Sequence, residues 1–104
     1  MEKVLIDIFI VPQESKAEFL EQTRKVQTFI RSLPGFVEGY IYEQKTGESH
    51  YNFLTTAVWE SEAAFDNAKG MAAREYQRLG FNPQETTKKL GVEVIRSSYE
   101  RSPY

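Results

Sequence analysis

Residues 51–65, with the sequence YNFLTTAVWESEAAF, limit most strongly how this chain can fold. The first part of this stretch alternates its side chains between two faces, which is typical of a β-strand. It carries the only tryptophan, Trp59, and leads into Ser61, a residue type that favours a helix N-terminus. We therefore predict a central strand that runs directly into a helix, and we expect any functional cavity to lie beside it.

Length and composition exclude several classes of protein. A chain of 104 residues has the size of one domain, and we predict a single domain over residues 1–104. Because there is no cysteine, disulfides, thiolate nucleophiles and Cys-ligated metals are excluded. With one histidine and no HxxE or DxD grouping, we expect no metal site. A formal net charge of −2 gives no basic excess that would attract nucleic acid or an anionic membrane.

The apolar N-terminal run, residues 4–11, is predicted to be a strand and not a signal peptide. It lacks a basic segment before it, Asp7 interrupts it, and no small-residue cleavage site follows. No apolar stretch is long enough to span a bilayer. We therefore expect a cytoplasmic protein.

The remaining pattern predicts an α+β domain with the ferredoxin-like order β-α-β-β-α-β. Ser15 and Glu18 fit a capping box at the start of the first helix, and Pro34-Gly35 ends it. The four strands are expected at residues 4–11, 36–45, 50–59 and 90–99, with helices between the first two and after the third and a short helical turn at 84–89. The strands should form one antiparallel sheet with both helices on one face.

Such a sheet leaves its second face uncovered. Both faces of the strand at 4–11 are apolar apart from Asp7, so either set of its side chains would add a large apolar area to that face. Packing against a second copy would bury this area, and we predict a homodimer through the open sheet face.

Two residues are candidate general bases. Asp7 is a carboxylate on an otherwise apolar strand face, where burial would raise its pKa. His50 stands near the third strand, and an unperturbed histidine titrates near neutral pH. The alternative interpretations are an Asp7 paired with an arginine or lysine at the end of the sheet and a surface His50 at the end of a hairpin.

Other side chains are candidate substrate contacts. Arg74 and Arg78 lie one helical turn apart and can clamp an anion, although arginines on helices commonly face solvent. Tyr76 and Asn52 offer a hydroxyl and an amide to a ligand. Trp59 is a candidate wall of the cavity, with a purely structural role in the core as the alternative.

Two segments carry a resemblance to a known family. The sequence LPGFVEGY at 33–40, followed by VWESEAAF at 58–65, resembles the antibiotic biosynthesis monooxygenase (ABM) family. The resemblance extends over about residues 3–99 and implies a dimeric α+β barrel. Because this superfamily includes quinone-forming oxygenases and haem-degrading enzymes, the fold alone does not fix the function.

Similarity to the actinorhodin-pathway oxygenase implies chemistry without metal or flavin. In those members an acidic phenolic substrate loses a proton, and its carbanion reacts with O₂ in an apolar cavity. Trp59 matches the cavity tryptophan, whereas Phe65 stands where those members have a tyrosine, and the family arginine corresponds to Arg74 or Arg78. Haem-degrading relatives need a histidine late in the second helix, and no histidine follows Ala57, which argues against haem degradation.

The leading hypothesis is a cofactor-independent monooxygenase that acts on a small aromatic or quinol-type substrate with O₂. Trp59, Phe65 and Tyr76 would line its cavity, with Asp7 or His50 as the base. The alternative is a non-catalytic, stress-associated dimer that binds a small apolar ligand in the same cavity. A third hypothesis is an interaction module whose interface is filled solid, with no cavity.

Overall fold

The computed structural model describes residues 1–104 and has the predicted order of strands and helices, including the short helix expected near residues 84–89, with one added 3₁₀ turn. The elements in chain order are β1 (Lys3–Ile10), the 3₁₀ turn η1 (Gln13–Ser15), α1 (Lys16–Ile30), β2 (Phe36–Glu43), β3 (Phe53–Trp59), α2 (Glu62–Leu79), α3 (Pro83–Lys89) and β4 (Glu93–Tyr99). The predicted α+β, ferredoxin-like fold is confirmed. The second, third and fourth strands are shorter than expected.

The four strands form one antiparallel sheet in the order β2-β3-β1-β4. The two central strands are therefore the apolar N-terminal strand and the strand that carries Trp59. Asp7 lies opposite Thr55 on one side and opposite Arg96 on the other. This register brings together residues that are 89 positions apart in the chain.

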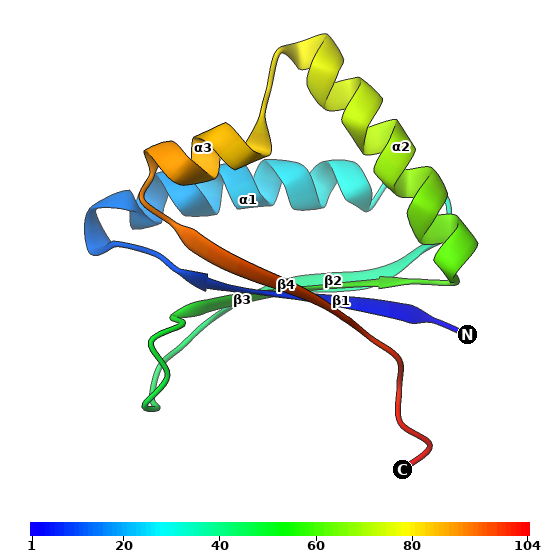
Figure 1. The fold of residues 1–104 in the computed structure, drawn as a ribbon, viewed down its shortest axis with the longest axis horizontal. Coiled ribbons are helices and arrows are strands. Elements are labelled where there is room, and N and C mark those ends of the chain that lie inside the picture. Colours follow the sequence, from blue (N-terminus) through cyan, green and yellow to red (C-terminus); the bar gives the residue numbers. More distant parts are fainter.

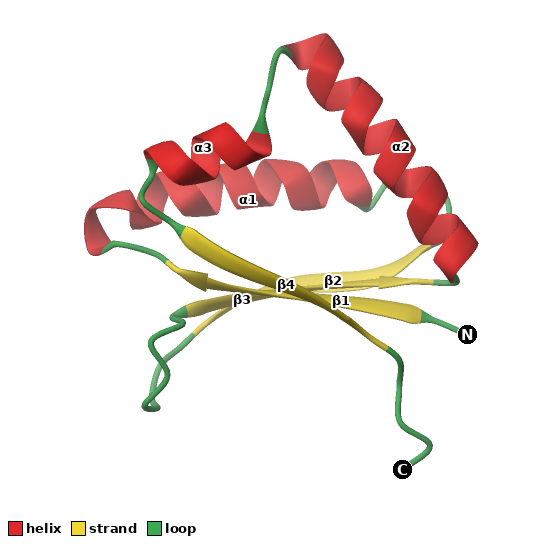
Figure 2. Cartoon of the chain, viewed as in Figure 1, coloured by secondary structure: helices red, strands yellow, loops and turns green.

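All three helices lie over one face of the sheet (Figure 1). α1 runs along the sheet, whereas α2 begins at the end of β3 and rises away from the strands (Figure 2). α3 connects the far end of α2 to β4 (Figure 1), and its C-terminal end lies beside the start of α1, where Ser15 is hydrogen-bonded to Leu90 O. Only the first part of α2 is therefore close to the sheet.

The position of α2 is fixed at its N-terminus. The Ser61 hydroxyl accepts a hydrogen bond from Ala64 N at 3.0 Å, which confirms Ser61 as the N-cap. The Glu60 N–H donates to Gly35 O at 2.8 Å. Gly35 has φ +84°, and a β-carbon there would lie 2.5 Å from the Ala64 β-carbon. The turn after α1 thus touches the first turn of α2 at a point where only glycine fits.

The capping box predicted at the start of α1 is wrong. Ser15 is the N-cap residue, but its side chain makes no cap hydrogen bond. Its hydroxyl donates instead to Leu90 O at 2.6 Å. The serine is buried against the end of α3, so the nearest acceptor is a carbonyl from the other end of the chain.

The core has two parts, one near each end of α1. One contains Leu5, Leu33, Trp59 and Ala68, and the other contains Val11, Phe19, Phe53 and Val92. No single large side chain is completely enclosed. The space between the two parts is the cavity described below.

The face of the sheet without helices is strongly apolar. One ladder of paired residues crosses all four strands at the same height and consists of Tyr42, Leu54, Ile8 and Ile95. Tyr40, Tyr42, Ile95 and Tyr99 are about half exposed. The β2–β3 loop and the C-terminal tail both extend beyond this face (Figure 1). We refer to the helix-free side of the sheet as the outer face.

Candidate functional site

The space between the sheet and the three helices is a cavity of about 720 Å³. Of its 27 lining residues, 15 are hydrophobic, so the wall suits the apolar body of a ligand. The volume also lies in the range of typical small-molecule sites, which is about 300–1,000 Å³. The cavity exists because α2 rises from the sheet and its small residues Ala68, Ala72 and Ala73 face the gap.

Trp59 forms one wall of this cavity. The centroid of its ring lies 5.3 Å from the ring centroid of Phe36 and 6.3 Å from that of Phe65. Only 3% of the residue is exposed, yet its indole Nε1–H has no hydrogen-bond partner in the protein. A buried donor without a partner carries a free-energy cost, and other protein atoms cover Nε1 itself, so the cavity wall is formed by other atoms of Trp59.

Gln27 of α1 also lines the cavity and has a second buried polar atom without a partner. The residue is 8% exposed, and its Oε1 has no donor within reach. Its Nε2 donates weakly to Thr56 O at 3.4 Å. The carboxamide lies over Gly39, where a β-carbon would come within 3.2 Å of Oε1. The missing side chain on β2 therefore makes room for a polar group above the sheet.

Asp7 and Arg96 form the charged part of the wall. Arg96 Nε donates to Asp7 Oδ1 at 2.9 Å, and Arg96 Nη2 donates to Asp7 Oδ2 at 3.0 Å. Both carboxylate oxygens are thus held in a fork-shaped pair. The Asp7 side chain is 13% exposed and that of Arg96 is 63% exposed. The carboxylate raises the pKa of the Arg96 guanidinium, although partial burial opposes the effect.

Tyr76 of α2 lies between the aromatic and the charged parts of the site. Its ring packs against those of Phe29 and Phe81, with distances between ring centroids of 6.2 Å and 5.4 Å. Burial raises the pKa of the Tyr76 hydroxyl, and the positive charge of Arg96 partly opposes this. The hydroxyl is therefore a neutral hydrogen-bond donor at physiological pH.

Four of the eight residues selected from the sequence line the cavity, namely Asp7, Trp59, Phe65 and Tyr76. His50 is exposed in the loop between β2 and β3 and is not part of the wall. Arg74 and Arg78 are also exposed outside it, and Arg78 forms an ion pair with Glu75 at 2.8 Å.

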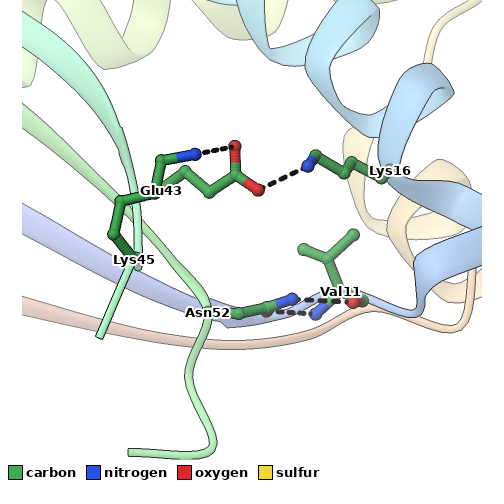
Figure 3. Close-up of polar contacts among 5 residues, drawn as sticks. All are labelled: Val11, Lys16, Glu43, Lys45 and Asn52. Atoms are coloured by element: carbon green, nitrogen blue, oxygen red, sulfur yellow. Dashed lines mark hydrogen bonds and ion pairs between the residues drawn. The ribbon is translucent and has the colours of Figure 1, made fainter. Parts of the chain in front are cut away.

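Asn52 is occupied elsewhere in the fold. Its Oδ1 accepts from Val11 N at 2.8 Å, and its Nδ2 donates to Val11 O at 2.9 Å (Figure 3). Lys16 and Lys45 both pair with Glu43 nearby (Figure 3). These contacts join the base of the β2–β3 loop to the segment between β1 and α1.

The wall residues that were not selected from the sequence include Gln27, Thr55 and Arg96. Gln27 belongs to a helix in which polar residues commonly face solvent, and Thr55 gave only a weak polar signal. Arg96 stands in a polar segment near the C-terminus. The sequence analysis gave an arginine or lysine as one possible partner of Asp7, and the β1–β4 register identifies this partner as Arg96.

Two further properties bear on the kind of site. No group of three or more His, Cys, Asp or Glu side chains is arranged to hold a metal ion. No helix has the length and apolar character that a bilayer crossing requires.

Comparisons with solved structures show the same fold in several bacterial proteins. A proposed monooxygenase from Shewanella loihica PV-4 is 22% identical, with a TM-score of 0.74 over 99% of this chain and 96% of that protein. SnoaB from Streptomyces nogalater, described as a cofactor-independent oxygenase, is 21% identical, with a TM-score of 0.74 over 99% and 95%. The heme-degrading protein Rv3592 from Mycobacterium tuberculosis is 23% identical, with a TM-score of 0.59 over 66% and 78%. At these low sequence identities, the structural similarity shows that the proteins share a fold, and it does not by itself assign a function.

A search of curated protein sequences found no significant match. The model of the antibiotic biosynthesis monooxygenase family matches residues 1–76, which is well over half of the chain and includes β1, β3, Trp59 and most of α2. The chain belongs to the antibiotic biosynthesis monooxygenase family.

Proposed function

We propose that this protein is a small monooxygenase that oxidises a flat aromatic or quinol-type substrate with O₂ and needs no metal or flavin. The observation that carries the proposal is the apolar cavity of about 720 Å³ whose wall includes Trp59. Membership of the monooxygenase family supports the reaction class, and the description of SnoaB as cofactor-independent supports the absence of a cofactor.

The reaction that suits such a site starts with loss of a proton from an acidic ring carbon of the substrate. The resulting carbanion reacts with O₂. One oxygen atom becomes a new carbonyl oxygen, and the other leaves as water with the two hydrogens of that carbon. We propose that the Trp59 N–H, which has no partner in the protein, turns toward the cavity when substrate binds and stabilises the negative charge that develops on a substrate oxygen. Of the two predicted bases, only Asp7 lines the cavity, and it remains our candidate for the proton acceptor.

Oxygen consumption with anthrone as the substrate tests this proposal. The wild-type protein should consume O₂ faster than the same buffer with heat-denatured protein. Trp59→Phe keeps an aromatic ring but removes the N–H, and loss of a hydrogen bond to a developing charge should lower the rate roughly 10- to 100-fold. His50→Gln, outside the cavity, is the matched control and should keep the full rate.

A wild-type rate equal to spontaneous oxidation, over a series of anthrones and hydroquinones, would overturn the enzymatic proposal. Asp7→Asn addresses the base separately. If Asp7 accepts the proton, this variant should bind anthrone but lose most of its O₂ consumption.

A second function, ligand binding without catalysis, is favoured by two observations. Phe65 offers no hydroxyl to the cavity, and both oxygens of Asp7 are already occupied by Arg96. Saturable quenching of Trp59 fluorescence by anthrone, without any O₂ consumption, would support this function in place of the enzyme.

We further propose that the protein is a homodimer in which two outer faces pack together. The supporting observation is the apolar ladder through Ile8 and Ile95, with half-exposed tyrosines around it. An apolar area that extends over four strands is unusual on a monomer. Sheet-on-sheet packing would cover it and leave the cavity on the opposite side of each sheet.

A further inference from the structure

Arg96 stands on an edge strand, on the face that carries the helices. It lies opposite Asp7 in the β1–β4 register and contributes to the cavity wall. Because α2 rises away from the sheet, this part of β4 is left open, and Val94, two residues earlier, is about half exposed. The guanidinium group is therefore accessible from the cavity and from solvent.

The pairing with Asp7 fixes the orientation of the guanidinium group. Nε and Nη2 each donate one hydrogen bond to the carboxylate. A guanidinium has five N–H donors, so those on Nη1 and the second one on Nη2 remain without a carboxylate partner. Arg96 is thus a pre-oriented donor and not a freely moving surface side chain.

The burial of the two partners is unequal. The Asp7 side chain is 13% exposed and that of Arg96 is 63% exposed, so a ligand meets the guanidinium before the carboxylate. The neutral hydroxyl of Tyr76 lies near enough to feel the charge of Arg96 and adds a donor on the α2 side. The only other charged residue of the wall is Lys69, also a cation. This side of the cavity therefore presents donors and positive charge, although the whole chain carries a net charge of −2.

The two polar ends of the cavity are well separated. Asp7 pairs with Thr55, and Trp59 lies four residues further along β3, about 13 Å away at 3.3 Å per residue. The surface between them is largely apolar. A ligand that uses both ends must be long, flat and apolar in the middle.

We propose that the Asp7–Arg96 pair is the anion receptor of the cavity and that it selects long apolar ligands with a carboxylate or phenolate at one end. Arg96 contacts the anionic oxygen, and Asp7 is the positioning residue that holds Arg96. This inference rests on the proposed function only in taking the cavity as the ligand site.

Two probes that differ only in charge test the proposal, namely anthraquinone-2-carboxylate and anthraquinone-2-carboxamide. Trp59 is the only tryptophan and lies in the cavity wall, so quenching of its fluorescence reports binding at this site. The wild-type protein should bind the carboxylate roughly 10-fold or more tightly than the carboxamide, because a hydrogen bond to a charged group is stronger than a neutral one.

Arg96→Gln should reduce this preference to nearly one, whereas Asp7→Asn should keep or increase it, because it removes a negative charge that repels the carboxylate and leaves the guanidinium in place. Arg74→Gln removes the same charge from the exposed side of α2 and should keep the preference. Circular dichroism checks that each variant is folded. If Arg96→Gln does not fold, Arg96→Lys keeps the charge without the fork-shaped pair and should show a preference between the wild-type value and one.

Equal binding of the two probes by the wild-type protein, or a preference that survives Arg96→Gln, would overturn the inference. Because the probes are already oxidised, their binding does not depend on turnover. A protein that prefers the carboxylate but consumes no O₂ with anthrone would reject the enzymatic function and retain the anion receptor. Anthrone oxidation without any preference for the carboxylate would retain the enzymatic function and reject the anion receptor.

Discussion

Asn52 shows how a single side chain can replace strand pairing. The register between β1 and β3 ends at Phe9, and the amide of Asn52 then satisfies both backbone groups of Val11. These groups are partly buried, so leaving them unpaired carries a free-energy cost. The residue thus closes one end of the sheet, on the side away from Trp59.

Replacing Asn52 by alanine should lower the free energy of unfolding by about 1–3 kcal/mol, because two partly buried backbone groups lose their partners. Urea denaturation measures this change. Asn67→Ala, at an exposed position of α2, is the control and should change stability by less than about 0.5 kcal/mol. Equal effects of the two substitutions would contradict the structural role of Asn52.

Tyr76 makes stability depend on pH in the alkaline range. Burial raises the pKa of its hydroxyl, whereas a tyrosine in the unfolded chain ionises near pH 10. Below about pH 10 both states hold the proton, so pH has no effect through this group. Above it the unfolded chain loses the proton first, and rising pH therefore favours unfolding until the folded state ionises.

The free energy of unfolding should therefore fall more steeply above about pH 10 in the wild-type protein than in Tyr76→Phe. Denaturation curves between pH 8 and pH 11 measure the difference. Tyr104→Phe, at the exposed C-terminus, should follow the wild-type curve. Parallel curves for the wild-type protein and Tyr76→Phe would be inconsistent with the raised pKa of this hydroxyl.

The predictability of the site differed from residue to residue. Asp7 was identifiable because a carboxylate interrupts an apolar strand, and Trp59 because it ends a strand directly before a helix cap. Arg96 was not, because its role depends on a pairing with a residue 89 positions away. Gln27 follows the polar pattern of a helix surface, and only the three-dimensional packing shows that its amide is buried.

At the scale of elements, the main feature is that α2 is held at one end. Its first turn contacts Gly35 and is capped by Ser61, whereas its C-terminal part rises from the sheet and ends at Gly80, which has φ +67°. The order of strands and helices followed from the sequence because apolar periodicity and turn residues are local signals. The tilt of α2, which creates the cavity, depends on non-local packing and had no such signal.

A pair of glycine substitutions tests the contact at the start of α2. Gly35→Ala and Gly80→Ala both put a side chain at positive φ, but only at Gly35 would the new β-carbon meet another atom, Ala64 Cβ at 2.5 Å. Gly80→Ala should cost about 1 kcal/mol from backbone strain. Gly35→Ala should cost a further 1–3 kcal/mol, approximately the usual penalty of overpacking. Thermal denaturation of both variants compares them, and similar losses would argue against a tight contact at Gly35.

At the scale of the whole molecule, the sheet separates two surfaces with different predicted roles. The cavity lies on the helix side, and the outer face is open to a second copy. The β2–β3 loop and the C-terminal tail extend past the outer face and are placed to flank such a partner (Figure 1).

Ile95→Lys should convert the proposed dimer to a monomer, because it introduces a charge into the apolar ladder of the outer face. Sedimentation equilibrium measures the change in mass. Leu79→Lys is a matched control, since Leu79 is an exposed apolar residue at the end of α2 and lies outside this face. A wild-type protein that sediments as a monomer at micromolar concentration would contradict the dimer.

The alternation of β1 has a consequence for chain length. Leu5, Asp7 and Phe9 line the cavity, while Ile6 and Ile8 belong to the outer face. Removing or adding one residue within β1 would exchange the two sets on one side of the change, so that apolar outer-face residues would enter the cavity or Asp7 would enter the outer face. β1 can therefore accept substitutions but not insertions or deletions. Among related chains, we expect differences in length to accumulate in the loop at residues 44–52, where an extra residue alters neither surface.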